Sequence, residues 1–140
     1  MLTRFIQAQE NDYFIALEEI KRGKKQSHWM WYIFPQIQGL GHSSTSKYFA
    51  IANIEEATEY LNHPILGNRL IEICNELLKL YNNDAYSIFG SPDNRKLKSS
   101  ITLFSQVPDA NPIFKSVLDK FFDGEPDYKT LKKLNELNLK

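Results

Sequence analysis

Apolar residues recur at intervals of three and four along most of this chain, and this spacing constrains the fold more than any other feature of the sequence. The spacing is clearest between residues 66 and 81, where the apolar positions are Leu66, Leu70, Ile73, Cys74, Leu77 and Tyr81. Side chains three or four residues apart lie on one face of an α-helix. The pattern therefore predicts an amphipathic helix over residues 66–81.

Helix start and stop signals predict five further helices. Asn53 followed by Glu56 is typical of a capping box at the start of a short helix. Asn111 followed by Pro112 indicates another helix start, which leads into a broad apolar face. The other helices are expected over residues 6–22, where Asn11 is a place for a break, over residues 93–107 and over residues 131–137.

No strand signal competes with these helices. The chain contains no long run that alternates apolar and polar residues, and no Asn-Gly or Asp-Gly turn between two such runs. Its 140 residues are close to the usual size of one domain, and neither an internal repeat nor a linker rich in glycine, serine and proline divides them. We predict an all-α fold: one domain over residues 1–140, with six to eight helices in an irregular array and no substantial sheet.

The balance of charges argues against a general nucleic-acid-binding protein. Lysine plus arginine and aspartate plus glutamate both number 17, so the chain lacks the positive excess that holds a polyanion without sequence-specific contacts. The single cysteine, Cys74, cannot form an internal disulfide, which fits a reducing compartment. No stretch approaches the roughly 20 apolar residues that cross a bilayer, and the first residues do not resemble an export signal. We expect a cytoplasmic protein with no general nucleic-acid binding and no membrane association.

Two segments are poorly explained as the interior of a helical domain. In residues 25–46, bulky aromatic residues lead directly into a loop with Gly39 and Gly41 and then into hydroxyl side chains. In residues 93–106, polar side chains form a stripe beside the apolar positions of the predicted helix. These two segments are the candidates for a functional site.

The same two segments carry a family resemblance. The run that contains Trp29 and Trp31, and residues 90–104 with their Pro-Asp and Lys-Leu-x-Ser-Ser-x-Thr-Leu-Phe elements, are similar to the DUF1810 family of proteins of unknown function. The likeness extends from Arg4 to Asp127. This resemblance implies a mainly α-helical, cytosolic bacterial protein, and it implies no activity. Some members are labelled calpastatin, but the inhibitory segments of calpastatin are disordered and repetitive, unlike this chain.

The polar groups of both segments indicate a site for an anion. A loop with Ser43 before a short helix can present backbone N–H groups and hydroxyls, which attract phosphate at a helix N-terminus. Lys96 can offset the charge of a phosphate or carboxylate. The hydroxyls that accompany it on the predicted helix are Ser99, Ser100 and Thr102. The alternatives are a flexible loop with a serine N-cap and a polar helix face that contacts only water.

Aromatic and imidazole side chains complete the predicted site. Trp29 or Trp31 can supply a flat wall for a ligand, and the alternative is that both rings pack in the core. His28 is the candidate for proton transfer because histidine exchanges protons near neutral pH, and the alternative is an ordinary exposed or hydrogen-bonded histidine. Ser27 is expected to cap the aromatic helix. The three histidines and Cys74 lack the spacing of a metal site, so we predict neither a metal nor a cofactor.

Function is predicted at the level of ligand class. We expect a small anionic metabolite of the nucleotide or phosphate type to bind in a cleft formed by residues 25–46 and 93–106. The sequence leaves open whether that metabolite is turned over. The alternative is a structural or protein-interaction module, whose partner the sequence does not identify. A concave pocket would favour the first hypothesis, and an exposed apolar patch would favour the second.

Overall fold

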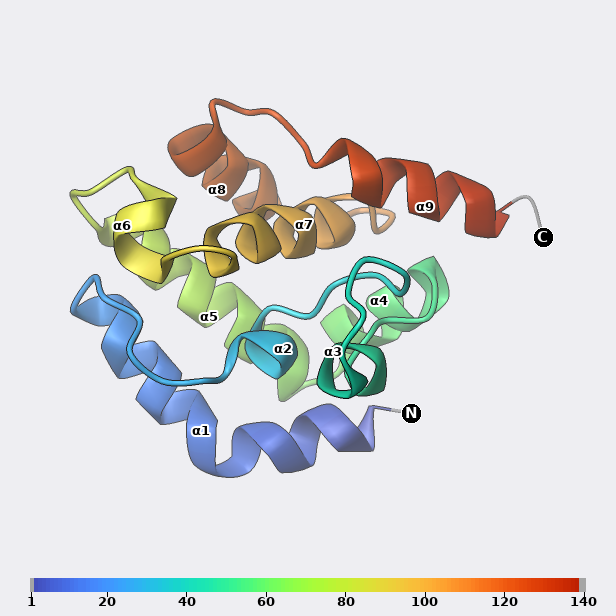
Figure 1. Cartoon of the computed structure of the whole chain (residues 1–140), viewed down its shortest axis with the longest axis horizontal. Coiled ribbons are helices and arrows are strands. Elements are labelled where there is room, and N and C mark those ends of the chain that lie inside the picture. The colour runs from blue at the N-terminus through green and yellow to red at the C-terminus, as the bar shows by residue number, and fades with distance from the viewer. Residues whose placement is uncertain (1, 139–140) are drawn as a thin grey trace.

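The computed structural model describes residues 2–138, and their regular structure is helical (Figure 1). The longer helices are α1 (Thr3–Lys21), α4 (Ile54–Asn62), α5 (Leu66–Lys79), α7 (Asp93–Ser105), α8 (Ile113–Phe122) and α9 (Tyr128–Asn138). The short helices are α2 (Met30–Ile33), α3 (Ser44–Tyr48) and α6 (Ala85–Phe89). Within the described residues there is no strand, and one isolated parallel bridge joins Ile37 to Ile51. The all-α prediction is confirmed, with nine helices over residues 2–138 where six to eight were expected.

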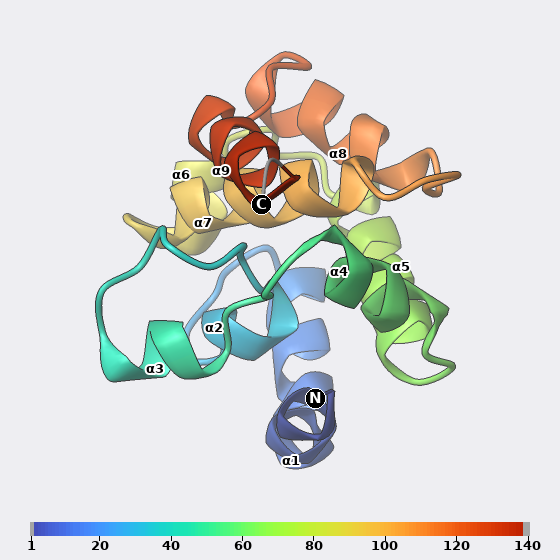
Figure 2. The ribbon, with the colours of Figure 1, turned by 90° about the vertical axis from the view of Figure 1, so that its right-hand side faces the viewer.

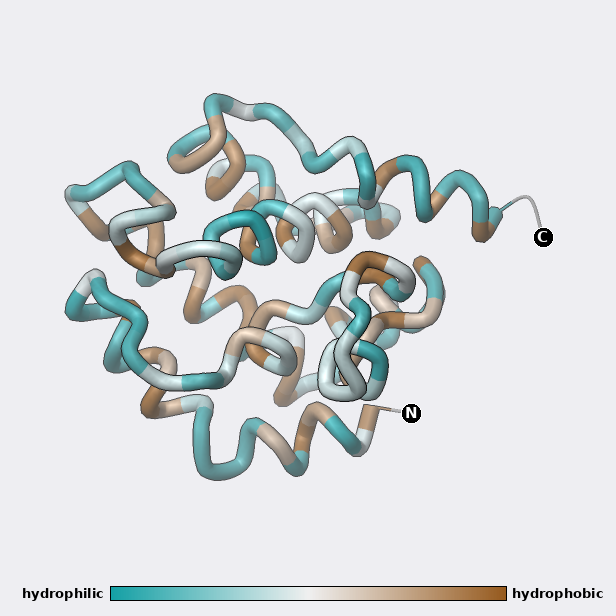
Figure 3. The backbone as a smooth tube through the Cα atoms, viewed as in Figure 1, coloured by the Kyte–Doolittle hydropathy of each residue, from teal (hydrophilic) through white to brown (hydrophobic). Residues whose placement is uncertain are grey.

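Helices α5 and α7 form the centre of the array (Figure 1). Helix α5 packs against α1, α4 and α8, whereas α7 packs against α4, α6, α8 and α9. Apolar positions recur along the helices around this centre (Figure 3). Helix α5 buries the predicted face from Leu66 to Leu77, but it ends at Lys79, and Tyr81, which was expected on that face, is fully exposed. Helix α7 is buried at every position over residues 99–104. A helix enclosed in this way has to bury its polar side chains as well.

The predicted cap is confirmed at the start of α4, and Asn111 makes a similar hydrogen bond before α8, which begins at Ile113, one residue later than predicted. The side-chain oxygen of Asn53 accepts a hydrogen bond from Glu56 N at 2.9 Å, and that of Asn111 accepts one from Ile113 N at 2.9 Å. Helix α1 is continuous from Thr3 to Lys21, although its axis bends visibly in Figure 1. The aromatic segment differs from expectation because α2 begins only at Met30 and has no side-chain cap.

The tight corner between α4 and α5 depends on Gly67. A Cβ atom at this position would lie 2.0 Å from the carbonyl oxygen of Leu61, so no larger residue fits without moving the backbone. The ring of His63 stabilises the same corner, because its Nδ1 accepts hydrogen bonds from Ile65 N at 3.1 Å and Leu66 N at 3.3 Å. His63 is therefore a structural residue.

The connection from α2 to α3 passes alongside α7 before it reaches α3 (Figures 1 and 2). Gln38 N donates to Ile51 O at 2.9 Å, and Ile51 N donates to Gln36 O at 2.8 Å, so the two ends of the connection are held together. The guanidinium of Arg4 in α1 donates to the backbone oxygen of Ala50 at 2.8 Å. These hydrogen bonds close the loop of the first candidate segment and tie its end to α1.

Candidate functional site

Glu19 of α1 fixes the start of the first candidate segment. Its carboxylate accepts hydrogen bonds from Gln26 N at 2.8 Å, from Ser27 N at 2.9 Å and from the indole N–H of Trp29 at 2.9 Å. The hydroxyl of Ser27 donates to the same carboxylate. Burial alone would raise the pKa of Glu19, but the hydrogen bonds outweigh it and lower the pKa to about 2. We call Glu19 and its three partners the Glu19 cluster.

The Glu19 cluster decides where Trp29 and His28 lie. Trp29 is 1% exposed, and its ring packs near Phe34 and Phe89 in the core. Trp29 therefore packs in the core and has no exposed surface for a ligand, as the alternative to a ligand wall predicts. His28 stands between two residues of the cluster with its side chain exposed, and it lines neither of the two pockets described next. Ser27 is engaged by Glu19 and does not cap α2.

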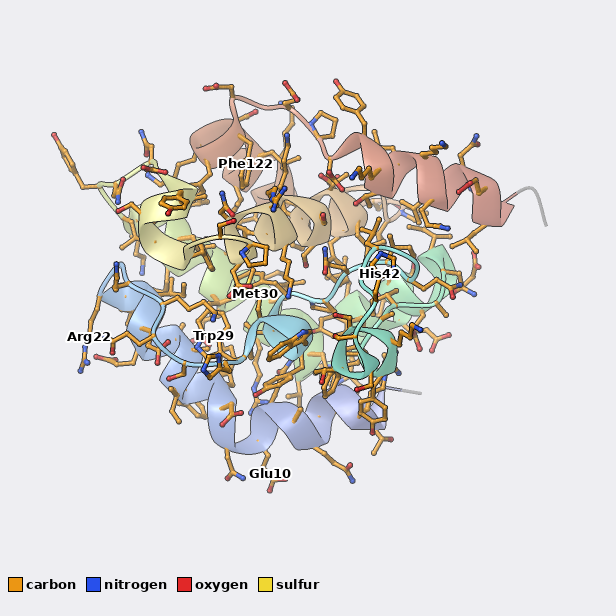
Figure 4. All side chains as sticks on the ribbon, viewed as in Figure 1. Glu10, Arg22, Trp29, Met30, His42 and Phe122 are labelled. Carbon is orange, nitrogen blue, oxygen red and sulfur yellow. The ribbon has the colours of Figure 1, made fainter. Side chains whose placement is uncertain are left out.

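A pocket of about 340 Å³ lies beside α3, and we call it the α3 pocket. Its walls come from α2, the α2–α3 connection, α3 and the residues that follow: Trp31, Gln36, Ile37, Gln38, Gly39, Gly41, His42, Ser46, Lys47, Phe49 and Ala50. Figure 4 labels His42 on the loop before α3. Two aromatic rings with a few polar side chains are the usual lining of a small-molecule pocket.

A second pocket, of about 440 Å³, lies where the loop of residues 36–41 meets α7 and the start of α9, and we call it the α9 pocket. It is lined by Gln36, Leu40, Gly41, Pro92, Arg95, Lys96, Lys98, Ser99, Pro126, Asp127, Tyr128 and Lys129. Both candidate segments contribute to this lining. They therefore meet in space, together with a third segment around α9.

Lys96 joins the two pockets. Its Nζ lies 5.1 Å from the centroid of the Trp31 ring, so a lysine of the α9 pocket contacts an aromatic wall of the α3 pocket. Asp93 lies 3.8 Å from the same Nζ, but it lies closer, at 2.9 Å, to the ammonium of Lys25, whose side chain is only 8% exposed. The charge of Asp93 is therefore balanced chiefly by Lys25, and the charge of Lys96 is only partly offset.

Further cations line the pockets without a partner. Over residues 2–138, the side chains of Arg95 and Lys129 in the α9 pocket and of Lys47 in the α3 pocket make neither a hydrogen bond nor an ion pair. Lys98 is paired with Glu125 at 3.5 Å. Because the whole chain has zero net charge, this gathering of positive side chains is a local feature.

The hydroxyls of α7 attach the segment that leads into α9. Ser99 Oγ donates to Asp127 Oδ2 at 3.0 Å, Thr130 Oγ1 donates to the same atom at 2.6 Å, and Thr102 Oγ1 accepts from Asp127 N at 2.9 Å. Ser100 and Thr102 are fully buried and line neither pocket, and Ser100 Oγ has no hydrogen-bond partner in the described part of the chain. Of the three predicted hydroxyls, only Ser99 reaches the α9 pocket. The stripe is neither a ligand site as a whole nor a face in contact with water.

Ser43 is the N-cap of α3. Its Oγ accepts a hydrogen bond from Ser46 N at 3.0 Å. Ser43 therefore caps the helix, as the alternative to anion binding predicts. The side chain of Ser43 is exposed and lines neither pocket, although the neighbouring His42 and Ser46 both line the α3 pocket. Of the eight predicted site residues, the structure brings together Trp31, Lys96 and Ser99 and leaves His28, Trp29, Ser43, Ser100 and Thr102 outside the pockets.

Sequence reasoning missed four side chains of this site: Gln36, His42, Arg95 and Lys129. Gln36 and Gly41 line both pockets, and the Gln36 amide has no hydrogen-bond partner within the described residues. Arg95 adjoins Lys96 in the chain and could have been selected with it. Lys129 had no such signal, because it reaches the α9 pocket only through the fold of the segment before α9.

The described residues contain neither a metal-binding cluster nor a membrane-spanning helix. No group of three or more His, Cys, Asp or Glu side chains in residues 2–138 is arranged to hold a metal ion. In the same residues, no helix has the length and apolar character that a membrane span requires.

Known proteins resemble this chain over almost its whole length. The family model described as protein of unknown function (DUF1810) matches residues 1–134. A solved structure, that of the conserved hypothetical protein Rv1873 from Mycobacterium tuberculosis, is 41% identical, with a TM-score of 0.93 and 96% of each chain covered. Comparison with curated proteins finds no match. By its family match and this likeness, the chain belongs to the DUF1810 family of proteins of unknown function.

Proposed function

We propose that this protein binds a small phosphate-bearing anion in the α9 pocket. The observation that carries the proposal is the convergence of Arg95, Lys96 and Lys129 on one pocket of a chain with zero net charge. The cytoplasmic location that the single cysteine predicts is part of the same proposal.

The chemistry of these three cations favours phosphate. A guanidinium such as that of Arg95 can donate to two oxygens of one phosphate, whereas an ammonium acts as a point charge with three donors. The Lys96 side chain is 21% exposed, so water screens its charge less than that of a fully exposed lysine. Within residues 2–138, the Arg95 and Lys129 side chains make no hydrogen bond or ion pair that an anion would have to replace. A bound anion would also relieve the repulsion among the three.

The substitution Lys96→Gln tests the proposal. The melting temperature would be measured in inorganic phosphate, pyrophosphate and ribose 5-phosphate, each against chloride at equal ionic strength. A ligand that binds only the folded state stabilises it by RT ln(1 + [L]/Kd). We expect a phosphate probe to raise the wild-type Tm by several degrees and Lys96→Gln to remove most of this rise. Phosphorus NMR of the same mixtures reports whether a bound probe is also turned over.

The matched control is Lys115→Gln. Lys115 is a lysine of α8 whose side chain is 76% exposed, and it lines neither pocket. The substitution Lys115→Gln gives the protein the same net charge as Lys96→Gln. The control should keep the full wild-type rise. A rise that is absent in the wild type, or equal in the wild type and Lys96→Gln, would contradict the proposal.

The second candidate function is that of a protein-interaction module. It is favoured by Phe14 and Ile15, two consecutive apolar residues of α1 that are 64% and 48% exposed. Apolar side chains exposed together can form a binding surface. This function predicts a stable complex formed through these two side chains. Light scattering would detect the complex as self-association, and Phe14→Ser should disrupt it. A monomer at every concentration would count against it.

A further inference from the structure

We propose that the ligand is a nucleoside 5′-phosphate, with its base in the α3 pocket and its phosphate in the α9 pocket. The inference rests on the proposed function, because it assigns the phosphate to the same cations. It adds the second pocket, which a bare phosphate would leave unused.

The two pockets are close enough to take one ligand. Gln36 and Gly41 line both, so the pockets share part of their walls. Trp31 of the α3 pocket and Lys96 of the α9 pocket are in direct contact, with Nζ 5.1 Å from the ring centroid. Their volumes, about 340 and 440 Å³, lie in the range of about 300–1,000 Å³ that small-molecule sites occupy. A ligand with two chemically different ends can therefore place one in each pocket.

The linings of the two pockets differ in the way that such a ligand requires. The α3 pocket has the rings of Trp31 and Phe49, the His42 imidazole and one cation, Lys47. The α9 pocket has four cations, Arg95, Lys96, Lys98 and Lys129, against one carboxylate, Asp127, and its one aromatic ring is that of Tyr128. Aromatic rings bind planar bases by stacking, and grouped cations bind phosphate. The base end and the phosphate end of a nucleotide match these two linings.

The amide of Gln36 lies where the two pockets meet. In residues 2–138 this amide has no hydrogen-bond partner, whereas the amide of Gln38 donates to Ala52 O at 2.9 Å and helps to hold the wall. A free amide offers a donor beside an acceptor, and that pair is complementary to the edge of a nucleobase. Gln36 can therefore contribute specificity that the rings, which stack on any base, do not supply.

The test compares probes that add one part of the ligand at a time. Dissociation constants of the full chain would be measured by calorimetry for inorganic phosphate, ribose 5-phosphate and the adenosine, guanosine, cytidine and uridine 5′-monophosphates. We expect at least one nucleoside monophosphate to bind about tenfold more tightly than ribose 5-phosphate, because stacking on an aromatic side chain is worth about 1–3 kcal/mol per base and 1.4 kcal/mol is a tenfold change.

Two substitutions of Trp31 assign this gain to its ring. Trp31→Leu should remove most of the gain that the base gives, and it should weaken the binding of ribose 5-phosphate much less, through the lost contact with Lys96 alone. Trp31→Phe keeps a ring and should restore much of the gain. Ligand binding should also change the tryptophan fluorescence of the wild type, and this change should be lost in Trp31→Phe, because Trp29 is buried away from the pockets. A purely structural role for Trp31 would not separate base binding from phosphate binding in this way.

The outcomes separate this inference from the proposed function. If ribose 5-phosphate and all four nucleotides bind equally well, or if Trp31→Leu weakens them all equally, the two-pocket ligand is wrong and the phosphate site stands. If none of the probes binds the wild type, both proposals are wrong.

Discussion

Two stretches of one segment use their polar groups in opposite ways. In residues 25–29, the backbone and side chains donate to the buried carboxylate of Glu19. In residues 36–47, the side chains of Gln36, His42 and Lys47 have no hydrogen-bond or ion-pair partner within the described residues, and all three line the α3 pocket. Figure 4 shows Trp29 and His42, one from each stretch, at separate places in the fold.

The difference shows that a polar residue becomes a site candidate through its surroundings more than through its type. A buried polar group must be paired, because leaving it unpaired costs free energy, whereas a group at a pocket can exchange water for a ligand. The two stretches should therefore respond to mutation differently. Changes in the Glu19 cluster should lower stability, and changes around the pockets should lower binding.

The largest effect is expected for Glu19→Ala. This change leaves the buried indole donor of Trp29 and the part-buried N–H donors of Gln26 and Ser27 without their acceptor, and an unsatisfied buried donor costs about 1–3 kcal/mol. We expect the free energy of unfolding in urea to fall by about 3 kcal/mol or more. The control is Glu18→Ala on the same helix, a 54% exposed carboxylate, with an effect of about 0.5 kcal/mol or less. Equal losses in the two variants would mean that the cluster does not hold the fold.

The same carboxylate should make stability depend on pH. The pKa of Glu19 is about 2 in the folded protein against an ordinary value of 4.5, so its contribution is present above about pH 4.5 and is lost as the pH falls toward 2. The shift corresponds to about 3 kcal/mol. Denaturant unfolding between pH 7 and pH 2.5 should therefore show the advantage of the wild type over Glu19→Gln shrinking in acid. An advantage that is constant over this range would exclude the lowered pKa.

A smaller effect is expected for Thr102→Val. This substitution keeps the shape of the side chain but removes the acceptor of Asp127 N, so the segment before α9 loses one attachment. We expect a loss of about 1–2 kcal/mol in the free energy of unfolding. Phosphate binding, measured by thermal shift, should fall much less than in Lys96→Gln, because Thr102 is fully buried, lines neither pocket and acts only by holding the segment that carries Lys129. If binding is lost while the fold stays intact, Thr102 belongs to the site as the sequence first suggested.

The long helices could be predicted from the sequence because their stabilising contacts follow a local repeat. The apolar face of α5 and the caps at Asn53 and Asn111 involve residues three or four positions apart or closer. The short helix α6 was missed because its five residues are too few to show a repeat. The start of α2 was predicted wrongly at Ser27, because a more distant residue, Glu19, binds that hydroxyl.

The candidate site was predicted less well because its contacts join distant parts of the chain. Lys96 and Trp31 meet across more than sixty positions, and Ser99 binds Asp127 in a segment that the sequence did not single out. The runs of polar residues in segments 25–46 and 93–106 indicated that these segments do more than fill an apolar core. They did not show which hydroxyls would be enclosed by the helices around α7.

The smallest effect is expected for His28→Gln, although His28 was the sequence's candidate for proton transfer. Its side chain is exposed and lies outside both pockets, so we expect a change of about 0.5 kcal/mol or less in the free energy of unfolding and no change in ligand binding. His42→Gln is the matched variant, because His42 is also exposed but lines the α3 pocket. It should be equally stable and should weaken the binding of a nucleoside monophosphate measured by calorimetry. If His28→Gln weakened binding and His42→Gln did not, the ligand would bind the outer surface of residues 25–29 and not the pockets. Residues 25–29 would then be the binding stretch, and residues 36–47 would not.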